Sequence, residues 1–102
     1  MKDADLYGGL VRLHILYHAS KEPVFGFGII EELGRHGYKL SAGTLYPMLH
    51  SMEKAGYLRS RSRLVVGKMR RNYRITAGGR KALAAAKEKV TELFGELFED
   101  NS

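Results

Sequence analysis

Hydrophobic positions recur at helical spacing along the first third of the chain. From about residue 4 to residue 19, an apolar stripe repeats every three or four positions, which is typical of one face of an α-helix. The stripe consists of Leu6, Leu10, Leu13 and Tyr17. Pro23 is expected to end this helix, because proline restricts the backbone of the residue before it. A shorter helix is expected over 26–36, with Gly37 as its terminator.

A third helix is expected between Ser41 and Gly56, and its start depends on Pro47. If Ser41 is the N-cap, Pro47 lies beyond the first turn, where its ring opposes a helical carbonyl. A start at Thr44 would place Pro47 inside the first turn, where no hydrogen bond is lost. We therefore expect a loose turn over 41–43 and a regular helix from about Thr44.

From Tyr57 the hydrophobic period changes to two, which is typical of β-strands. Arginines alternate with other residues in the first strand, and a similar alternation follows over 69–76. Residues 65–68, which include Gly67, are expected to form the turn. The pattern predicts a hairpin with cationic side chains and a glycine at its tip.

The last apolar pattern runs from Thr76, a suitable N-cap, to about Glu99. Its residues alternate by three and four, as in a coiled-coil seam. They are Leu83, Ala86, Val90, Leu93 and Leu97, with Phe94 and Phe98 beside them. At 1.5 Å per residue the helix would be roughly 30–35 Å long. The short domain before it can hardly cover that length, which favours a second copy as the partner.

The elements are therefore three helices, a hairpin and a long helix, which is the order of a winged helix-turn-helix. The sequence predicts a mainly α fold with a small β-hairpin. We expect residues 1–76 to form a winged helix-turn-helix DNA-binding domain. Residues 77–102 would add a C-terminal dimerisation helix to the same structural unit.

The charge distribution points to nucleic acid. The 102-residue chain has a formal net charge of +6, and no Asp or Glu occurs between Lys54 and Lys87. A solvated face usually mixes both signs, so a long acid-free basic stretch favours an anionic partner. Double-stranded DNA fits both this charge and the winged-helix order.

Several other functions are disfavoured by the sequence. The chain has no cysteine, which excludes disulfides, a cysteine nucleophile and the usual structural zinc sites. Neither a secretory signal nor an apolar run of membrane-spanning length is found, so we expect a cytoplasmic protein that does not bind membranes. We find no arrangement of nucleophile and base and no phosphate-binding loop, and we expect neither an enzyme nor a cofactor.

His14 and His18 are four residues apart, a spacing that can bind a metal on one helix face. No third ligand is evident from the sequence. We therefore interpret both as ordinary surface or interface histidines and expect no metal site.

The candidate DNA contacts lie in the third helix and on the hairpin. In the helix they are Ser41, Gly43, Thr44, Tyr46, Pro47 and His50, and on the hairpin they are Lys68, Arg70 and Arg71. A recognition helix enters the major groove, while a wing meets phosphates or the minor groove. The alternatives are that Ser41 only caps the helix, that Tyr46 packs in the core, and that the hairpin cations protect an edge strand.

Three stretches resemble the PadR family of winged-helix regulators. They are residues 41–58, which begin SAGTLYPML and end MEKAGYL, residues 72–80 (NYRITAGGR) and residues 22–27 (EPVFGF). Phe27 departs from the family pattern, in which tyrosine is expected. The resemblance covers the whole chain and matches the subfamily with a single helix after the wing.

This resemblance implies a repressor that binds inverted-repeat operators as a homodimer. The last helix would then pack against the N-terminal helix of the partner. The implied interface residues are Leu6, Leu10, Leu13, Tyr17, Leu83, Val90, Leu93, Phe94, Leu97 and Phe98.

The resemblance also suggests a small aromatic effector in a pocket between subunits, lined by Tyr7, Tyr17, Phe94 and Phe98. Plain hydrophobic packing of these rings is the simpler interpretation. The alternative for the protein as a whole is a winged-helix module that binds another protein and has no specific DNA affinity.

Overall fold

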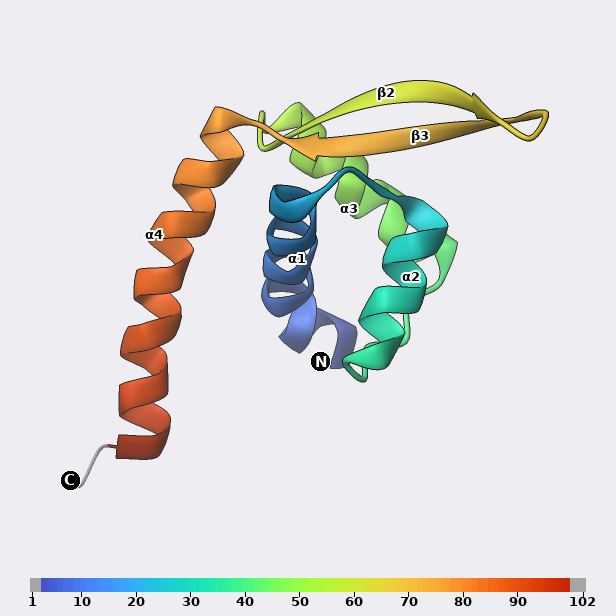
Figure 1. The fold of residues 1–102 in the computed structure, drawn as a ribbon. Coiled ribbons are helices and arrows are strands. Elements are labelled where there is room, and N and C mark those ends of the chain that lie inside the picture. The colour runs from blue at the N-terminus through green and yellow to red at the C-terminus, as the bar shows by residue number, and fades with distance from the viewer. Residues whose placement is uncertain (1–2, 100–102) are drawn as a thin grey trace.

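The computed structural model describes residues 3–99, with side chains from Leu6 onward. The elements are α1 (Asp3–Lys21), β1 (Val24–Phe25), α2 (Gly26–Arg35), α3 (Ala42–Lys54), β2 (Leu58–Val65), β3 (Lys68–Ile75), α4 (Ala77–Phe94) and a π-helical turn (Gly95–Glu99). Figure 1 shows the hairpin of β2 and β3 above the three helices of the body, with α4 to one side. The predicted mainly helical fold with a wing and a long last helix is confirmed.

The hydrophobic core lies where α1, α2 and α3 meet beneath the sheet (Figure 1). Ile15, Leu33, Leu45 and Leu49 have no exposed surface. The other buried residues are Val11, Leu16, Ala19, Val24, Ile29, Met52, Leu58, Tyr73 and Leu83. Every element from α1 to α4 therefore contributes at least one side chain to a single core.

Helix α1 has two apolar faces. The face around Ile15 is buried, whereas the stripe of Leu6, Leu10 and Tyr17 is 43–61% exposed. Leu13, between the two faces, packs partly against the core. The stripe that is most regular in the sequence is thus largely free of the chain's own core.

The start of α3 differs from the prediction. The helix begins at Ala42, and Ser41 caps it by accepting a hydrogen bond on Oγ from the Thr44 amide at 3.2 Å. The expected loose turn over 41–43 is wrong, because the Leu45 amide already bonds the Ser41 carbonyl at 3.0 Å. Pro47 is therefore inside the helix, opposite the carbonyl of Gly43. Gly43 is exposed, so water can solvate the carbonyl that Pro47 leaves without a donor.

The sheet has three antiparallel strands in the order β1-β3-β2. The predicted hairpin and its turn are confirmed, with Val65 opposite Lys68. Val66 and Gly67 both have positive φ, at 48° and 76°, as a two-residue turn between twisted strands requires. Strand β1 was not predicted; it places Phe25 opposite Asn72.

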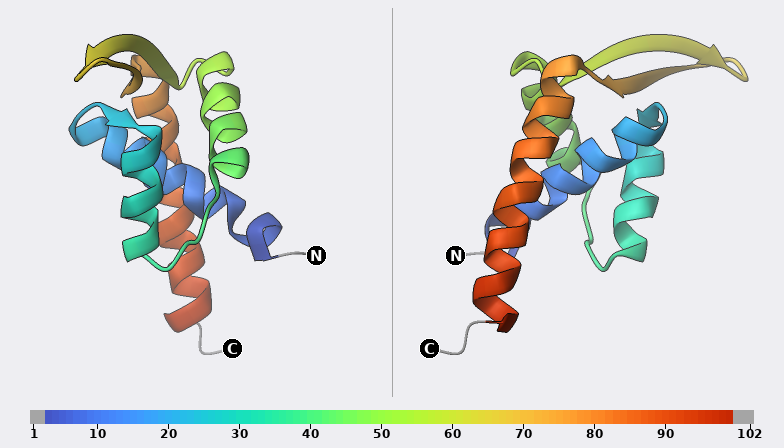
Figure 2. Two further views of the ribbon diagram at one scale, coloured as in Figure 1. Left: turned by 90° about the vertical axis from the view of Figure 1, so that its right-hand side faces the viewer. Right: turned by 60° about the vertical axis from the view of Figure 1, so that its left-hand side comes forward.

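Helix α4 starts from a tight junction with the sheet. Thr76 is the N-cap, as predicted: its Oγ1 accepts from the Gly79 amide at 2.9 Å and donates to the Gly56 carbonyl at 2.5 Å. Beyond this junction Leu83 is the last buried residue of the helix, and Figure 2 shows α4 leaving the body. Among the described residues, no helix has both the length and the apolar character that a membrane span requires.

Candidate nucleic-acid interface

The predicted contact residues of α3 lie on one open surface. Leu45, Leu49 and Met52 turn into the core, which leaves the rest of the helix facing outward. The predicted contacts Ser41, Gly43, Thr44, Tyr46, Pro47 and His50 are all exposed. The N-terminal half of α3 therefore presents its polar side chains to solvent.

Tyr46 is both exposed and packed. Its side chain is 46% exposed, yet its ring lies directly over Gly26, the first residue of α2. A Cβ atom on Gly26 would lie 2.5 Å from the Tyr46 hydroxyl oxygen, so a larger residue at this position would displace the ring. The tyrosine ring thus lies at the surface and is not buried in the core.

The wing cations are held in defined positions. The Arg70 guanidinium lies over the Phe25 ring, 3.8 Å from its centroid, a distance suited to a cation–π interaction. Arg71 donates from Nη1 to the Ser60 hydroxyl at 3.1 Å. Both arginines are exposed, and so is Lys68 beside the turn. Strand β1, which the sequence analysis missed, supplies the ring that positions Arg70.

Glu53 is an acidic group close to this surface, and its charge is engaged within the fold. Its Oε2 accepts hydrogen bonds from the Ser60 hydroxyl at 2.7 Å and the Ser60 amide at 2.8 Å. The hydroxyl bond is the main reason that the pKa of Glu53 lies below its usual value; burial opposes this shift, and the Ser60 amide, Arg71 and His50 add to it. The carboxylate thereby ties the end of α3 to β2.

The wing and the body enclose a hollow of about 550 Å³. It brings together Tyr46, Lys68, Arg70 and Arg71, all predicted contacts, from α3 and the wing. Sequence reasoning missed the rest of its lining, which is Phe25, Gly26, Phe27, Val65, Val66 and Met69. The sequence features that could have indicated these residues are the aromatic Phe25 soon after Pro23 and Gly26 at the start of a predicted helix.

The predicted dimer residues occupy a second surface. Most are exposed in the single chain, from 43% at Leu10 to 72% at Phe98. Leu83 differs, since it is 9% exposed and belongs to the chain's own core. Between α1 and α4 lies a groove of about 620 Å³, lined largely by apolar side chains that include Leu10, Leu13, Tyr17 and Val90.

The four aromatic residues considered for an effector pocket do not share one cavity in the single chain. Tyr7 packs edge-on against Tyr38, with ring centroids 6.1 Å apart. Phe94 and Phe98 contact each other near the C-terminal end of the described chain, with ring centroids 5.0 Å apart. Only Tyr17 lines the groove between α1 and α4.

The histidines of α1 have neighbours that the sequence did not reveal. The sequence shows no third ligand beside His14 and His18, whereas the structure brings His36, at the end of α2, beside them. Glu32 of α2 also reaches this cluster. Packing of α2 against α1 brings these residues together, and residues this far apart in sequence give no spacing signal.

A three-helix body with a basic wing and an open third helix defines the winged-helix class of DNA-binding proteins. Comparison with known proteins agrees with this class. The family model of the PadR-like transcriptional regulators matches residues 15–85. The protein named Transcriptional regulator Rv3488, from Mycobacterium tuberculosis, is 49% identical over 88 residues, which cover 86% of this chain and 82% of that protein.

Solved structures show the same fold. A PadR family transcriptional regulator from Eggerthella lenta superposes with a TM-score of 0.79 and 29% identity, over 95% of this chain and 88% of that chain. A transcriptional regulator from Clostridium thermocellum gives a TM-score of 0.83 and 25% identity, over 96% and 99% of the two chains. This chain belongs to the PadR-like family of transcriptional regulators. It is a DNA-binding regulator and not an enzyme.

Proposed function

We propose that this protein is a repressor that binds an inverted-repeat operator as a homodimer. The observation that carries the proposal is the hollow that joins Tyr46 of α3 to Lys68, Arg70 and Arg71 of the wing. With α3 as the recognition helix in the major groove, these three wing cations would lie against the neighbouring sugar-phosphate backbone of the DNA. A dimer covering two successive grooves at a promoter would exclude RNA polymerase sterically, and it would act in the cytoplasm.

The helix itself favours readout by shape and van der Waals contact. Before Lys54, α3 contains no Arg, Asn or Gln, the residues best suited to bidentate contacts with base edges in the major groove. Thr44, Tyr46 and Pro47 instead offer methyl, ring and pyrrolidine surfaces. We expect operator preference to depend on thymine methyl groups and DNA deformability as well as on hydrogen bonds.

The second copy is proposed to cover the apolar faces that the single chain leaves open. The outer stripe of α1 and the seam of α4 after Leu83 are both exposed and both apolar. A twofold axis lets α4 of each chain pack on α1 of the other, so that one contact closes both faces. In this arrangement, residues 1–76 bind DNA and residues 77–102 dimerise, with 1–2 and 100–102 outside the described residues.

The experiment is a fluorescence-anisotropy titration of duplexes tiled across the gene's own upstream region, at two salt concentrations. Tight binding to one tile, weakened about tenfold or more by Arg70→Ala/Arg71→Ala, is expected because each lost cation removes a phosphate contact. The matched control is Lys81→Ala/Lys89→Ala, which removes the same charge from exposed positions of α4. Weak binding of equal affinity to every duplex, lost at the higher salt concentration, would contradict the proposal and favour a protein-binding module.

An effector completes the proposal. We place a small aromatic compound in the groove between α1 and α4, where Tyr17 offers a ring and Leu10 and Val90 an apolar wall. Occupancy of this groove would compete with packing of the partner helix and release the operator. Titration of the operator complex with small aromatic acids tests this: release that Tyr17→Leu reduces supports the effector site, and unchanged anisotropy for every compound contradicts it.

A further inference from the structure

Three of the four histidines of the chain lie together. His14 and His18 are one turn apart on α1, and His36 follows the last residue of α2. Each offers a ring nitrogen, and these three nitrogens all lie within 4.8 Å of one another. The rings of His14 and His36 are stacked with centroids 4.6 Å apart, and His18 is beside both. Two separate helices thus bring three imidazoles to one point.

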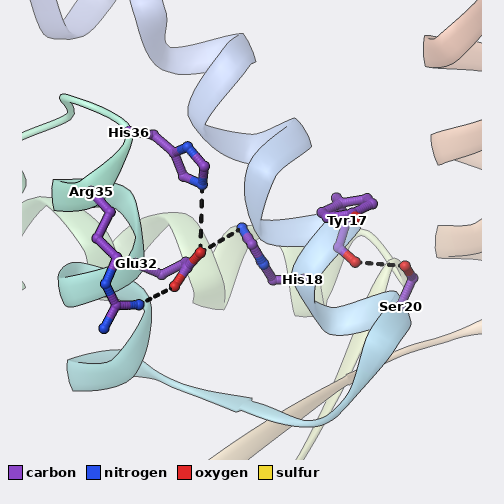
Figure 3. Close-up of polar contacts among 6 residues, drawn as sticks. All are labelled: Tyr17, His18, Ser20, Glu32, Arg35 and His36. Carbon is purple, nitrogen blue, oxygen red and sulfur yellow. Dashed lines mark hydrogen bonds and ion pairs between the residues drawn. The ribbon is translucent and has the colours of Figure 1, made fainter.

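Glu32 adds a carboxylate to this point, as Figure 3 shows for His18 and His36. Its Oε1 is 3.7 Å from Nε2 of His18 and 3.5 Å from Nε2 of His36. These distances are at or beyond the limit of a hydrogen bond. They are close to the separation of about 3.3 Å between two ligands of one tetrahedral zinc ion with bonds near 2.0 Å. The second carboxylate oxygen is engaged by Arg35, which holds Oε1 toward the histidines.

One nitrogen of the cluster has its bonding capacity unused. Nε2 of His18 is buried and has no hydrogen-bond partner among the described residues. Buried polar atoms are nearly always bonded, so such an atom calls for an explanation such as an ion. A metal ion would accept the lone pair of this nitrogen. The nitrogen lies on the side of the ring that faces Glu32 and His36.

We propose that His14, His18, His36 and Glu32 bind one divalent transition-metal ion of the zinc class. Imidazole nitrogens with one carboxylate suit zinc, cobalt and nickel, whereas calcium and magnesium prefer all-oxygen sites. Binding requires modest rotation of the imidazoles, because the present spread of 4.8 Å exceeds the ligand separation of a tetrahedral ion. The ion would link α1 to the end of α2 on the floor of the groove that faces α4, since all four residues line that groove.

The test is metal binding by the full chain after treatment with a chelator. Isothermal titration with Zn²⁺ at neutral pH is expected to give one site per chain, and Co²⁺ is expected to give the strong visible absorption of tetrahedral coordination. His36→Gln, at a position whose side chain is 42% exposed, is expected to lower Zn²⁺ affinity by about 10- to 100-fold. Glu32→Gln keeps the shape of the carboxylate and is expected to weaken binding as well.

The matched control is His50→Gln, which removes the one histidine outside the cluster. It is expected to bind Zn²⁺ with the affinity of the unmodified protein. Circular dichroism of the metal-free variants confirms that each is folded before titration. Absence of stoichiometric Zn²⁺ binding would overturn the proposal, and so would equal loss of affinity in His36→Gln and His50→Gln.

Discussion

Gly79 has the closest surroundings of the glycines in the described part of the chain. A Cβ atom at this position would lie 2.2 Å from the Tyr57 carbonyl oxygen and 2.7 Å from Cγ1 of Ile75. The neighbouring Gly78 has room, since its Cβ would meet the Gly56 carbonyl at 3.4 Å. Two adjacent glycines therefore differ sharply in what they tolerate.

Gly79→Ala is expected to destabilise the protein by about 1–3 kcal/mol or more, because a rigid carbonyl must move to admit the methyl group. Gly78→Ala is expected to change stability by less than about 1 kcal/mol. Urea denaturation followed by circular dichroism measures both. Equal midpoints for the two variants would show that the junction of β2 and α4 is looser than the structure indicates.

Glu53 gives a pH dependence at the same scale. Its pKa is below the usual value in the folded protein, chiefly through the Ser60 hydroxyl, with Arg71 and His50 as the charged neighbours. The folded form thus binds a proton less readily than the unfolded chain, and this contribution to stability is complete above about pH 4.5 and lost as the pH falls through the folded pKa.

Glu53→Gln is therefore expected to lower the melting temperature at pH 7 and to flatten its fall between about pH 5 and pH 3. Glu92→Gln, at an exposed position of α4, is the control and should leave both unchanged. Thermal unfolding across this range provides the measurement. An unchanged slope in Glu53→Gln would mean that the hydrogen bonds to Ser60 do not persist in solution.

At the scale of elements, the exposed seam of α4 is the feature with the clearest consequence. Leu93 is 45% exposed in the single chain, so a polar residue there should leave the monomer folded. Leu93→Asp is expected to shift the protein from dimer to monomer, because a buried unpaired carboxylate is costly at an apolar interface. Ala84→Asp, at an exposed position nine residues before Leu93 and so on the opposite face of the helix, should remain dimeric.

Light scattering after size-exclusion chromatography distinguishes the two variants. A dimer for both, with unchanged circular dichroism, would contradict the proposed use of α4. If the unmodified protein itself is monomeric, the proposed dimer is contradicted directly.

Local sequence pattern was enough to predict the larger elements. Periodicity and caps gave α1, α2, the hairpin with its turn and the start of α4 at Thr76, because these depend on neighbouring residues. The start of α3 was predicted wrongly, since the strength of the Ser41 cap outweighs the hydrogen bond lost at Pro47. Strand β1 was missed because two residues form a strand only when β3 lies beside them.

The same limit applied to the candidate sites. Exposed polar residues on α3 and cations on the wing were predicted to act together, and the structure places several of them around one hollow. The support of Arg70 by Phe25, and the meeting of His36 with His14 and His18, depend on contacts between distant segments. No spacing in the sequence encodes such contacts.

At the scale of the whole molecule, a symmetric dimer would fix the distance and the phase of two DNA-binding surfaces. Half-sites read on one face of B-DNA are separated by about 34–36 Å or a multiple of it. Insertion of five base pairs between the half-sites turns one of them by about half a turn, and we expect affinity to fall to the non-specific level. Anisotropy with the natural and lengthened operators measures this; equal affinity would indicate that each chain binds independently.

The junction at which α4 leaves the sheet has a mechanical consequence. From Ala77 to Phe94 the helix is an arm of 18 residues, or about 27 Å at 1.5 Å per residue. A tilt of about 10° at its base would move the far end by roughly 5 Å, which is about one seventh of the 34–36 Å helical turn of DNA. Two residues restrict the angle of α4 at its base: Thr76, which is hydrogen-bonded on both sides, and Gly79, which has no free space. The rigidity of this junction would therefore set the range of half-site separations that one dimer can bind.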